Sequence, residues 1–373
     1  MTKAADLANL IGNIKAGGGG VNRNIIINGA MNVAQRATSA TGLGADANTY
    51  DVCDRWLLSA NGTDGRLTIT QDSSAPSGFS NSTKLACTTT DTSIAAGEFL
   101  TFTQKIEGQN LQSFAKGTSD AKPFAVSFYV KGNASATYVA ELMDNDNSNR
   151  HVSKSFTVTT DWTRVELSFP ADTTGTFDDD NADSMVLNIW LHGGSTFTSG
   201  TLQQTWGTLV QANRAVGISS FLDSTSRTFF ITGVQLEVGQ NPTTFEHEPF
   251  ERTLNKCYRY FQKFTSSGAQ YHRFGVGLSF SSTAMSCPLF LMNTMRDVPA
   301  LGTTGTASNY AVNHNNDTVT AASSVPALAS TADNPTQNIG VTCAVSSGLD
   351  AGDVSMLISN NNTDSFLSLD AEL

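Results

Sequence analysis

Acidic side chains are the first residues in this sequence that could carry out chemistry. A glycoside hydrolase needs two carboxylates flanking the bond it cleaves. The densest acidic group is Asp178, Asp179, Asp180 and Asp183. These residues lie in the run DDDNAD, and a charge run of this kind in a turn cluster is typical of a solvated loop. No Ser-His-Asp arrangement can be read from the sequence either, and we expect no enzymatic activity.

A second acidic segment, DNDNSN at residues 144–149, could bind a metal. It places Asp144, Asp146 and Ser148 at alternate positions, as in the first half of a calcium loop, because a hard cation prefers several oxygens in a tight arc. The glycine and the closing glutamate of such a loop are absent, so a turn between strands explains the segment equally well. Ca²⁺ is kept as an alternative, and no other cofactor is expected. His247, between two glutamates, lacks the HExxH spacing of a zinc protease.

Aromatic side chains could bind a sugar, because flat rings stack on pyranose rings and nearby polar groups complete the hydrogen bonds. The candidates are Trp162, Trp206, Tyr138 and His192. Trp206 lies in the polar run LQQTWGT and is expected to be exposed. Trp190 lies between Ile189 and Leu191 in a strand-like run, and we expect it in the core.

The elements that would position these residues are short strands. Alternation with period two predicts strands at 66–72, 124–132, 163–169, 184–194, 215–223 and 228–239. Turn clusters rich in Asn, Asp, Gly and Ser separate them, and no amphipathic helices lie between them. This pattern favours an all-β sandwich over a βαβ fold.

The N-terminal segment has the period of a helix. Leu7, Leu10, Ile11 and Ile14 form one apolar stripe, and the four glycines at 17–20 end the segment. A helix this short is marginal alone in water, so it needs a partner. The alternatives are packing on its own chain or, as the glycine tether favours, self-association or attachment to another protein.

The chain divides into four predicted parts. Residues 1–20 form the attachment helix with its glycine linker, and 21–249 form the β-sandwich. The basic and apolar run at 250–264 is expected to be a connector helix, and 265–373 a smaller β domain. The Ala/Thr/Ser/Asn-rich stretch at 300–337 is of low complexity.

The overall composition excludes several classes of protein. The 373 residues carry a net charge of −11 without a basic cluster, which disfavours nucleic acid and anionic membranes as partners. No apolar run is long enough to span a bilayer, and the N-terminus lacks the apolar core of a signal peptide, so export by the usual secretory route is not expected. Five scattered cysteines without CxxC spacing argue against zinc and disulfides and are expected to be reduced.

The sequence contains three spaced motifs, NIIINGAMNVAQR at 24–36, DRW at 54–56, and QLEVGQNPTTFEHEPFERTLNKCYRYF at 235–261. Together they resemble the motifs of a group of bacteriophage tail-fibre and virion structural proteins. MNTMRDVPAL at 292–301 and the terminal LDAEL are similar to the usual ending of the group. Asn28-Gly29 would supply positive φ in a tight turn. We expect the motif residues to hold the fold and not to touch a ligand.

The resemblance implies a jelly-roll sandwich similar to carbohydrate-binding modules on a homotrimeric virion appendage, without catalytic residues. The predicted protein is made in the host cytoplasm and assembled into a tail fibre, where its N-terminus contacts other virion or tail proteins. Its β domains would meet a host-surface glycan or protein receptor. A head fibre or decoration protein without a receptor role is one alternative, and a glycan-cleaving depolymerase is the other.

Overall fold

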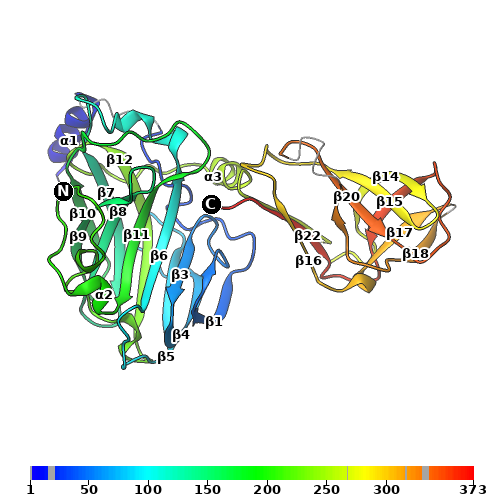
Figure 1. The fold of residues 1–373 in the computed structure, drawn as a ribbon, viewed down its shortest axis with the longest axis horizontal. Coiled ribbons are helices and arrows are strands. Elements are labelled where there is room, and N and C mark those ends of the chain that lie inside the picture. Colours follow the sequence, from blue (N-terminus) through cyan, green and yellow to red (C-terminus); the bar gives the residue numbers. More distant parts are fainter. Residues whose placement is uncertain (1, 16–21, 267, 316, 330–335) are drawn as a thin grey trace. The chain divides into compact units, whose positions relative to one another are not determined.

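The computed structural model describes residues 2–15, 22–266, 268–315, 317–329 and 336–373. The chain forms two compact units, Met1–Thr253 with Leu373, and Leu254–Glu372. Figure 1 shows the elements of both units. Their boundary lies within helix α3 (Phe250–Cys257), in the segment expected to connect two domains. The predicted glycine linker at 17–20 lies outside the described residues, as does part of 300–337.

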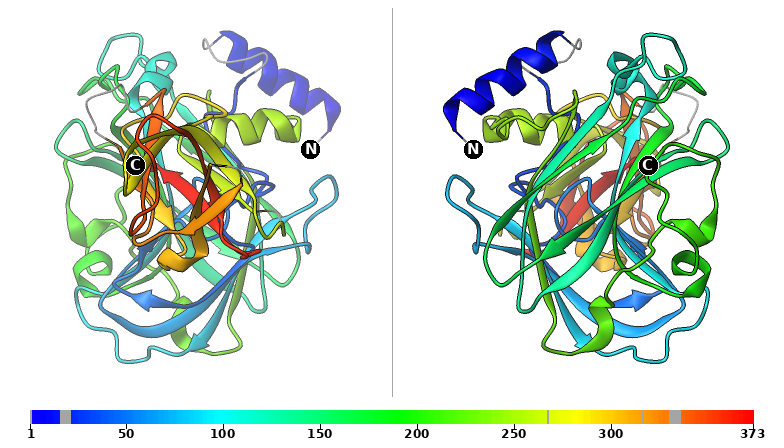
Figure 2. Two further views of the ribbon diagram at one scale, coloured as in Figure 1. Left: turned by 90° about the vertical axis from the view of Figure 1, so that its right-hand side faces the viewer. Right: turned by 90° about the vertical axis from the view of Figure 1, so that its left-hand side faces the viewer.

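Unit 1 contains two antiparallel six-stranded sheets, which can be followed in Figure 1 and from two further sides in Figure 2. The first sheet has the order β1 (Ser39–Ala45), β4 (Thr63–Asp72), β5 (Ser82–Thr89), β12 (Thr228–Val238), β7 (Phe124–Gly132) and β10 (Thr163–Phe169). The second sheet has the order β2 (Asn48–Thr49), β3 (Leu57–Asn61), β6 (Phe99–Glu107), β11 (Asp183–Gly193), β8 (Ala136–Asp144) and β9 (Arg150–Val158).

The core of unit 1 lies between these two sheets. Leu67 and Phe128 from the first sheet join Phe102 and Leu187 from the second in one buried apolar cluster. Each strand alternates its side chains between the two faces, so one face of every strand can enter this shared core. The predicted β-sandwich is therefore confirmed at the level of the fold.

One predicted strand is absent. Residues 215–223 form no strand but end in the 3-10 helix η4 (Phe221–Asp223), within a long excursion between β11 and β12. The buried side chains of Phe221 and Leu222 produced the apolar pattern, and they join the core from this excursion. The excursion also holds α2 (Ser195–Thr198) and η3 (Gln211–Asn213), and its first part, residues 194–220, is called the cover segment below.

The opening motif is part of the fold, as expected. Asn28 is buried and has a φ of 57°, and its side chain bonds the backbone at Val33 and Asp54. Gly29 has a different role from the predicted one, because its backbone packs directly on β12: a Cβ there would lie 2.0 Å from the Val234 oxygen. Trp56 of the DRW motif donates from Nε1 to the Asn28 oxygen at 3.2 Å.

The third motif completes the same corner of the sandwich. The Glu246 carboxylate accepts the backbone N–H groups of Asn22, Arg23 and Asn24 at 2.6–3.0 Å. Gln235 of β12 accepts the Glu246 N–H at 2.8 Å. These bonds join two segments more than 200 residues apart in the sequence, and the motif residues act here as structural ties.

Unit 2 has its own sheets and core. A three-stranded sheet has the order β13 (Phe261–Thr265), β22 (Phe366–Asp370) and β16 (Ala300–Thr303). A seven-stranded sheet has the order β18 (Thr318–Ala321), β17 (Tyr310–His314), β21 (Val354–Ser359), β14 (Arg273–Ser281), β15 (Ala284–Leu289), β20 (Ile339–Ala344) and β19 (Ala327–Leu328). A separate apolar cluster that includes Met285, Tyr310 and Leu369 fills the interior. The predicted connector helix is thus too long, since its second half contains β13.

The remaining helical elements are short. Helix α1 spans Lys3–Lys15, and 3-10 turns occur at η1 (Gly108–Asn110), η2 (Gln112–Phe114) and η5 (Ala307–Asn309). No helix of the described residues has the length and apolarity needed to cross a membrane. The five cysteines are all free and buried.

Candidate functional site

Aromatic side chains gather on the outer face of the first sheet, among them half-buried Phe79, Tyr129 and Phe245 and exposed His247. The Phe79 ring lies 5.3 Å from Tyr129, 5.0 Å from Phe245 and 5.0 Å from His247, measured between centroids. Tyr129 projects from β7, Phe79 from the loop before β5, and the other two from the segment after β12. Gly233 of β12 leaves room for these rings, because a Cβ there would lie 2.7 Å from Phe79.

The same face continues along β7 toward Trp162. Lys131 lies two residues beyond Tyr129 on the same side of β7, and its Nζ is 5.0 Å from the Phe230 ring and 5.6 Å from the Trp162 ring. Trp162 and Phe230 meet edge to face at 6.1 Å. Strand pairing places Phe230 opposite Lys131 and Thr232 opposite Tyr129, so both groups of rings lie on one face.

The aromatic strip is the name used here for Phe79, Tyr129, Trp162, Phe230, Phe245 and His247. Its rings alternate with polar groups, among them Lys131, which also donates to the Ser74 hydroxyl at 3.3 Å. Apolar ring faces beside a small number of hydrogen-bonding groups are what a sugar-binding surface needs. Of the four aromatic candidates from the sequence, Trp162 alone lies on this strip.

The other three candidates are placed differently. Tyr138 of β8 is buried in the core and packs edge to face on Phe229 at 5.5 Å. His192 of β11 is fully buried. Trp206, expected to be exposed, is half-buried against the core, and its Nε1 donates to the Pro170 oxygen at 2.8 Å. Tyr138 and His192 are therefore closed to a sugar, and Trp206 lies away from the rings described above.

The outer face of the second sheet is closed by the cover segment. Trp190 faces outward from β11, but Phe197 of α2 lies 5.1 Å from its ring and the Arg214 guanidinium lies 4.7 Å from it. The backbone of the cover segment also bonds to that of β9, since the Ser153 N–H donates to the Gln203 oxygen at 2.6 Å. Trp190 is therefore buried as expected, in a small cluster under the cover segment and not in the main core.

Glu141 is the electrostatic centre beneath the cover segment. Arg214 donates two hydrogen bonds to its carboxylate at 2.7 and 2.8 Å, and Asn188 and Trp190 each donate one at 2.9 Å. His151 Nδ1 lies 3.1 Å from Oε1. Burial by itself raises the pKa of Glu141, but the charge and hydrogen bonds of Arg214, with those of His151, outweigh burial and lower it to about 2.

A lysine occupies the segment that was considered as a possible calcium loop. The ammonium of buried Lys116 contacts Asp144, lies 3.3 Å from Asp172 and donates to two backbone oxygens. Asn147 also donates to Asp144, and Asp146 Oδ2 accepts the Asp178 N–H at 2.9 Å. A fixed positive charge thus stands at Asp144, and the structure does not present Asp144, Asp146 and Ser148 as an open set of calcium ligands.

In the acidic run, Asp178, Asp179 and Asp180 are exposed. One Ser-His-acid contact does occur, since His192 Nδ1 lies 2.8 Å from Ser220 Oγ and Nε2 lies 3.5 Å from Glu98. Ser220 Oγ also accepts the Leu222 N–H at 3.1 Å as the N-cap of η4. The Ser220 hydroxyl thus caps η4 and contacts a buried imidazole. A hydroxyl held in this way is poorly placed to act as a nucleophile.

Helix α1 exposes part of its predicted apolar stripe. Leu7 and Ile11 are 57% and 45% exposed, and Leu10 is half-buried. The side chain of Ile14 lies outside the described residues. The attachment role of this stripe stays a prediction.

Comparisons with known proteins give structural neighbours only. No protein-family model and no curated protein matches the chain. A carbohydrate-binding module described as "CBM4 structure and function" has 13% identity and a TM-score of 0.28 over 57% of this chain and 97% of its own. TmCBM61, solved with β-1,4-galactotriose, has 10% identity and a TM-score of 0.30 over 58% of this chain and 99% of its own.

A third structure is the enzymatically active domain of tailspike protein 4 from bacteriophage CBA120. It has 17% identity and a TM-score of 0.30 over 58% of this chain, which spans only 21% of the tailspike chain. With TM-scores this low, none of these similarities transfers a ligand or an activity to the present chain.

Proposed function

We propose that this chain is a bacteriophage virion structural protein of the tail-fibre type. It forms a homotrimer, attaches to other virion proteins through its N-terminal helix, and presents its β domains to glycans on the host surface. The spaced motifs at 24–36, 54–56 and 235–261 support the virion assignment, because they resemble that group over most of the chain. The aromatic strip is the observation that carries the recognition role.

The strip suits a weak and repeated contact with sugars. Tyr129 projects from β7 and Trp162 from the turn just before β10, where it packs against Phe230, so both rings are already positioned before a sugar stacks on them. Several copies on one particle would sum weak individual contacts into useful avidity. The cover segment closes the opposite sheet, which leaves the first sheet as the aromatic face of unit 1 that a ligand can reach.

The first test is glycan binding by the full chain with Trp162 as the probe. We expect Trp162→Ala to weaken binding to host-surface glycans by about tenfold, since a stacked aromatic ring contributes about 1 kcal/mol beyond its buried area. Val210→Ala is the control, because Val210 is exposed on the cover segment away from the strip. Glycan arrays and competition with phage adsorption give the readout. Equal binding by wild type and Trp162→Ala would remove the strip from recognition.

The second test concerns position in the particle. Labelled antibody against the chain, with mass spectrometry of purified virions, should place it in the tail at a copy number divisible by three. A location on the head without an effect on adsorption would favour a decoration protein instead. Release of reducing ends from host polysaccharide would show a depolymerase and contradict the expected lack of catalysis.

A further inference from the structure

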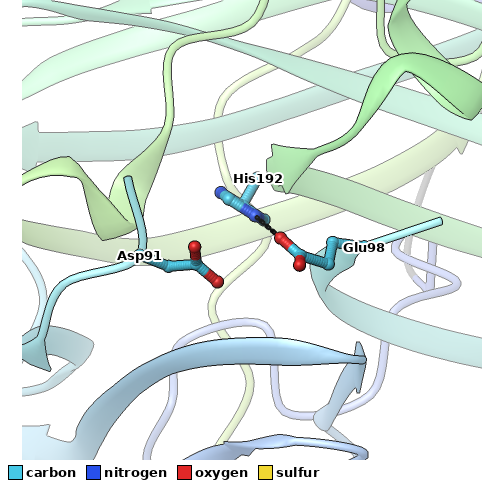
Figure 3. A group of neighbouring side chains, drawn as sticks. All are labelled: Asp91, Glu98 and His192. Atoms are coloured by element: carbon cyan, nitrogen blue, oxygen red, sulfur yellow. Dashed lines mark ion pairs between the residues drawn. The ribbon is translucent and has the colours of Figure 1, made fainter. Parts of the chain in front are cut away.

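The loop between β5 and β6 is anchored at each end by a buried acid. Asp91 and Glu98 are 3% and 6% exposed, while the six residues between them are exposed. His192 enters the same site from the end of β11 and is fully buried. Figure 3 shows both carboxylates directed toward the imidazole. One ligand atom from each of the three residues lies within 4.8 Å of the other two.

Two atoms in this group lack hydrogen-bond partners. Glu98 Oε2 and His192 Nε2 are buried, lie 3.5 Å apart, and neither makes a hydrogen bond. Within the described part of the chain, neither Asp91 nor Glu98 pairs with a lysine or arginine. Burying two carboxylates without a compensating cation is costly.

Asp91 also has a backbone donor. The Asp64 N–H, which donates to Asp91 Oδ2 at 2.8 Å, supplies a hydrogen bond but no net charge.

Ser220 can hold the imidazole in a tautomer that suits a metal. Its Oγ lies 2.8 Å from His192 Nδ1 and also accepts the Leu222 N–H. A hydroxyl oxygen has two acceptor lone pairs, so it can accept the Nδ1 proton as well. That tautomer leaves the lone pair of Nε2 directed at Glu98, and metal-bound histidines are oriented by such a bond from their second nitrogen.

We propose that Asp91, Glu98 and His192 bind a divalent cation of the zinc class. One imidazole nitrogen with two carboxylate oxygens is a ligand set that such a cation accepts, with water completing the coordination. Small movements of these side chains would bring the three ligand atoms within coordination distance of one ion. The ion would fasten both ends of the loop to β11, so its role is structural and independent of glycan recognition.

The test is metal binding by the full chain. After chelation, we expect one zinc ion per chain on re-addition, with a rise in Tm, and cobalt(II) should give visible d–d absorption. Calcium at the same concentration should bind at least tenfold more weakly, because imidazole favours a transition metal. Zinc binding below one equivalent, or tighter binding of calcium, would overturn the proposal.

Zinc binding by variants tests which residues form the site. Glu98→Gln and His192→Gln should each weaken zinc binding by tenfold or more. Asp161→Asn, which changes an exposed acid just before β10, should bind zinc as wild type does. Circular dichroism identifies a variant that fails to fold. In that case protease cleavage within residues 92–97 of the wild type is compared with and without zinc, and unchanged cleavage contradicts the proposal. Unchanged zinc affinity in folded variants contradicts it too.

Discussion

Glu141 is a buried carboxylate that is stabilised in its ionised form by the donors around it. It is fully buried, yet its pKa falls to about 2 because Arg214 and its other donors surround the carboxylate. Since one pKa unit corresponds to about 1.4 kcal/mol, ionisation of this group contributes on the order of 3 kcal/mol to folding at neutral pH. Arg214 belongs to the cover segment, so this free energy keeps that segment on the second sheet.

The first prediction is an acid-dependent loss of stability that depends on Glu141. A carboxyl group with a lowered folded pKa stabilises the fold fully above its unfolded pKa, near 4.5, and this contribution disappears as pH falls toward 2. We expect Glu141→Gln to unfold more easily at pH 7 and to show a flatter decline between pH 4.5 and 2, measured by urea unfolding. Glu166→Gln, an exposed acid on β10, is the control. Identical pH profiles for Glu141→Gln and wild type would contradict this.

At the residue scale the sequence predicted chemistry less well than it predicted structure. Asp144 was recognised as a possible ligand, but its actual partner, Lys116, lies 28 positions earlier in the sequence. The Asp91, Glu98 and His192 group was missed for the same reason, since His192 is some 100 residues from the two acids. Spacing within a segment reveals only sites built by that segment, and a β-sandwich builds its sites from strands distant in sequence.

At the scale of elements, Gly29 ties the opening motif to β12. The Val234 N–H donates to the Gly29 oxygen at 2.9 Å, and the close approach of the two backbones leaves no space for a side chain. We expect Gly29→Ala to destabilise unit 1 by about 1–3 kcal/mol, because the strand must move to admit the methyl group. Thermal and urea unfolding measure the change.

A glycine without such a neighbour provides the control for this second prediction. Gly97 has open space around the position of a Cβ, so Gly97→Ala should change the free energy of unfolding by less than about 0.5 kcal/mol. If Gly29→Ala and Gly97→Ala changed the free energy of unfolding equally, the close contact between residue 29 and β12 would not explain the need for a glycine at position 29.

The alternation of side chains predicted most strands of unit 1 because both sheets bury one face in a common core. β7 and β10 have the predicted bounds, at Phe124–Gly132 and Thr163–Phe169. The pattern failed at 215–223, where apolar residues enter the core from an irregular segment. An apolar pattern indicates which side chains are buried. It does not separate a strand from an irregular loop that buries the same side chains.

At the scale of the whole molecule, strand β14 of unit 2 turns its larger apolar side chains toward solvent. Val276, Leu278 and Phe280 are 50–58% exposed. The inward positions between them are Gly277 and Ser279, and a Cβ at Gly277 would lie 1.8 Å from the Ser286 oxygen. The neighbouring β21 adds Val354, which pairs with Leu278 and is 65% exposed. An apolar sheet face of this kind is typical of an interface.

The third prediction follows from this face and from the proposed homotrimer. We expect Leu278→Thr with Phe280→Thr to reduce the trimer to monomers in sedimentation and light-scattering measurements, since it replaces apolar contacts with exposed polar groups. Val298→Thr, an exposed residue outside the strands of this sheet, should leave the mass unchanged. A wild-type chain that sediments as a monomer would contradict the proposed trimer and assign this face to another partner.

The five buried thiols have a consequence for the proposed virion appendage. Burial raises the pKa of Cys53 and Cys343 to about 12 and that of Cys287 to about 11, so little of the reactive thiolate forms. Oxygen and peroxide outside the cell act mainly on exposed thiolates. A fibre built from this chain could therefore persist in aerated surroundings for long periods without cross-linking to its neighbours.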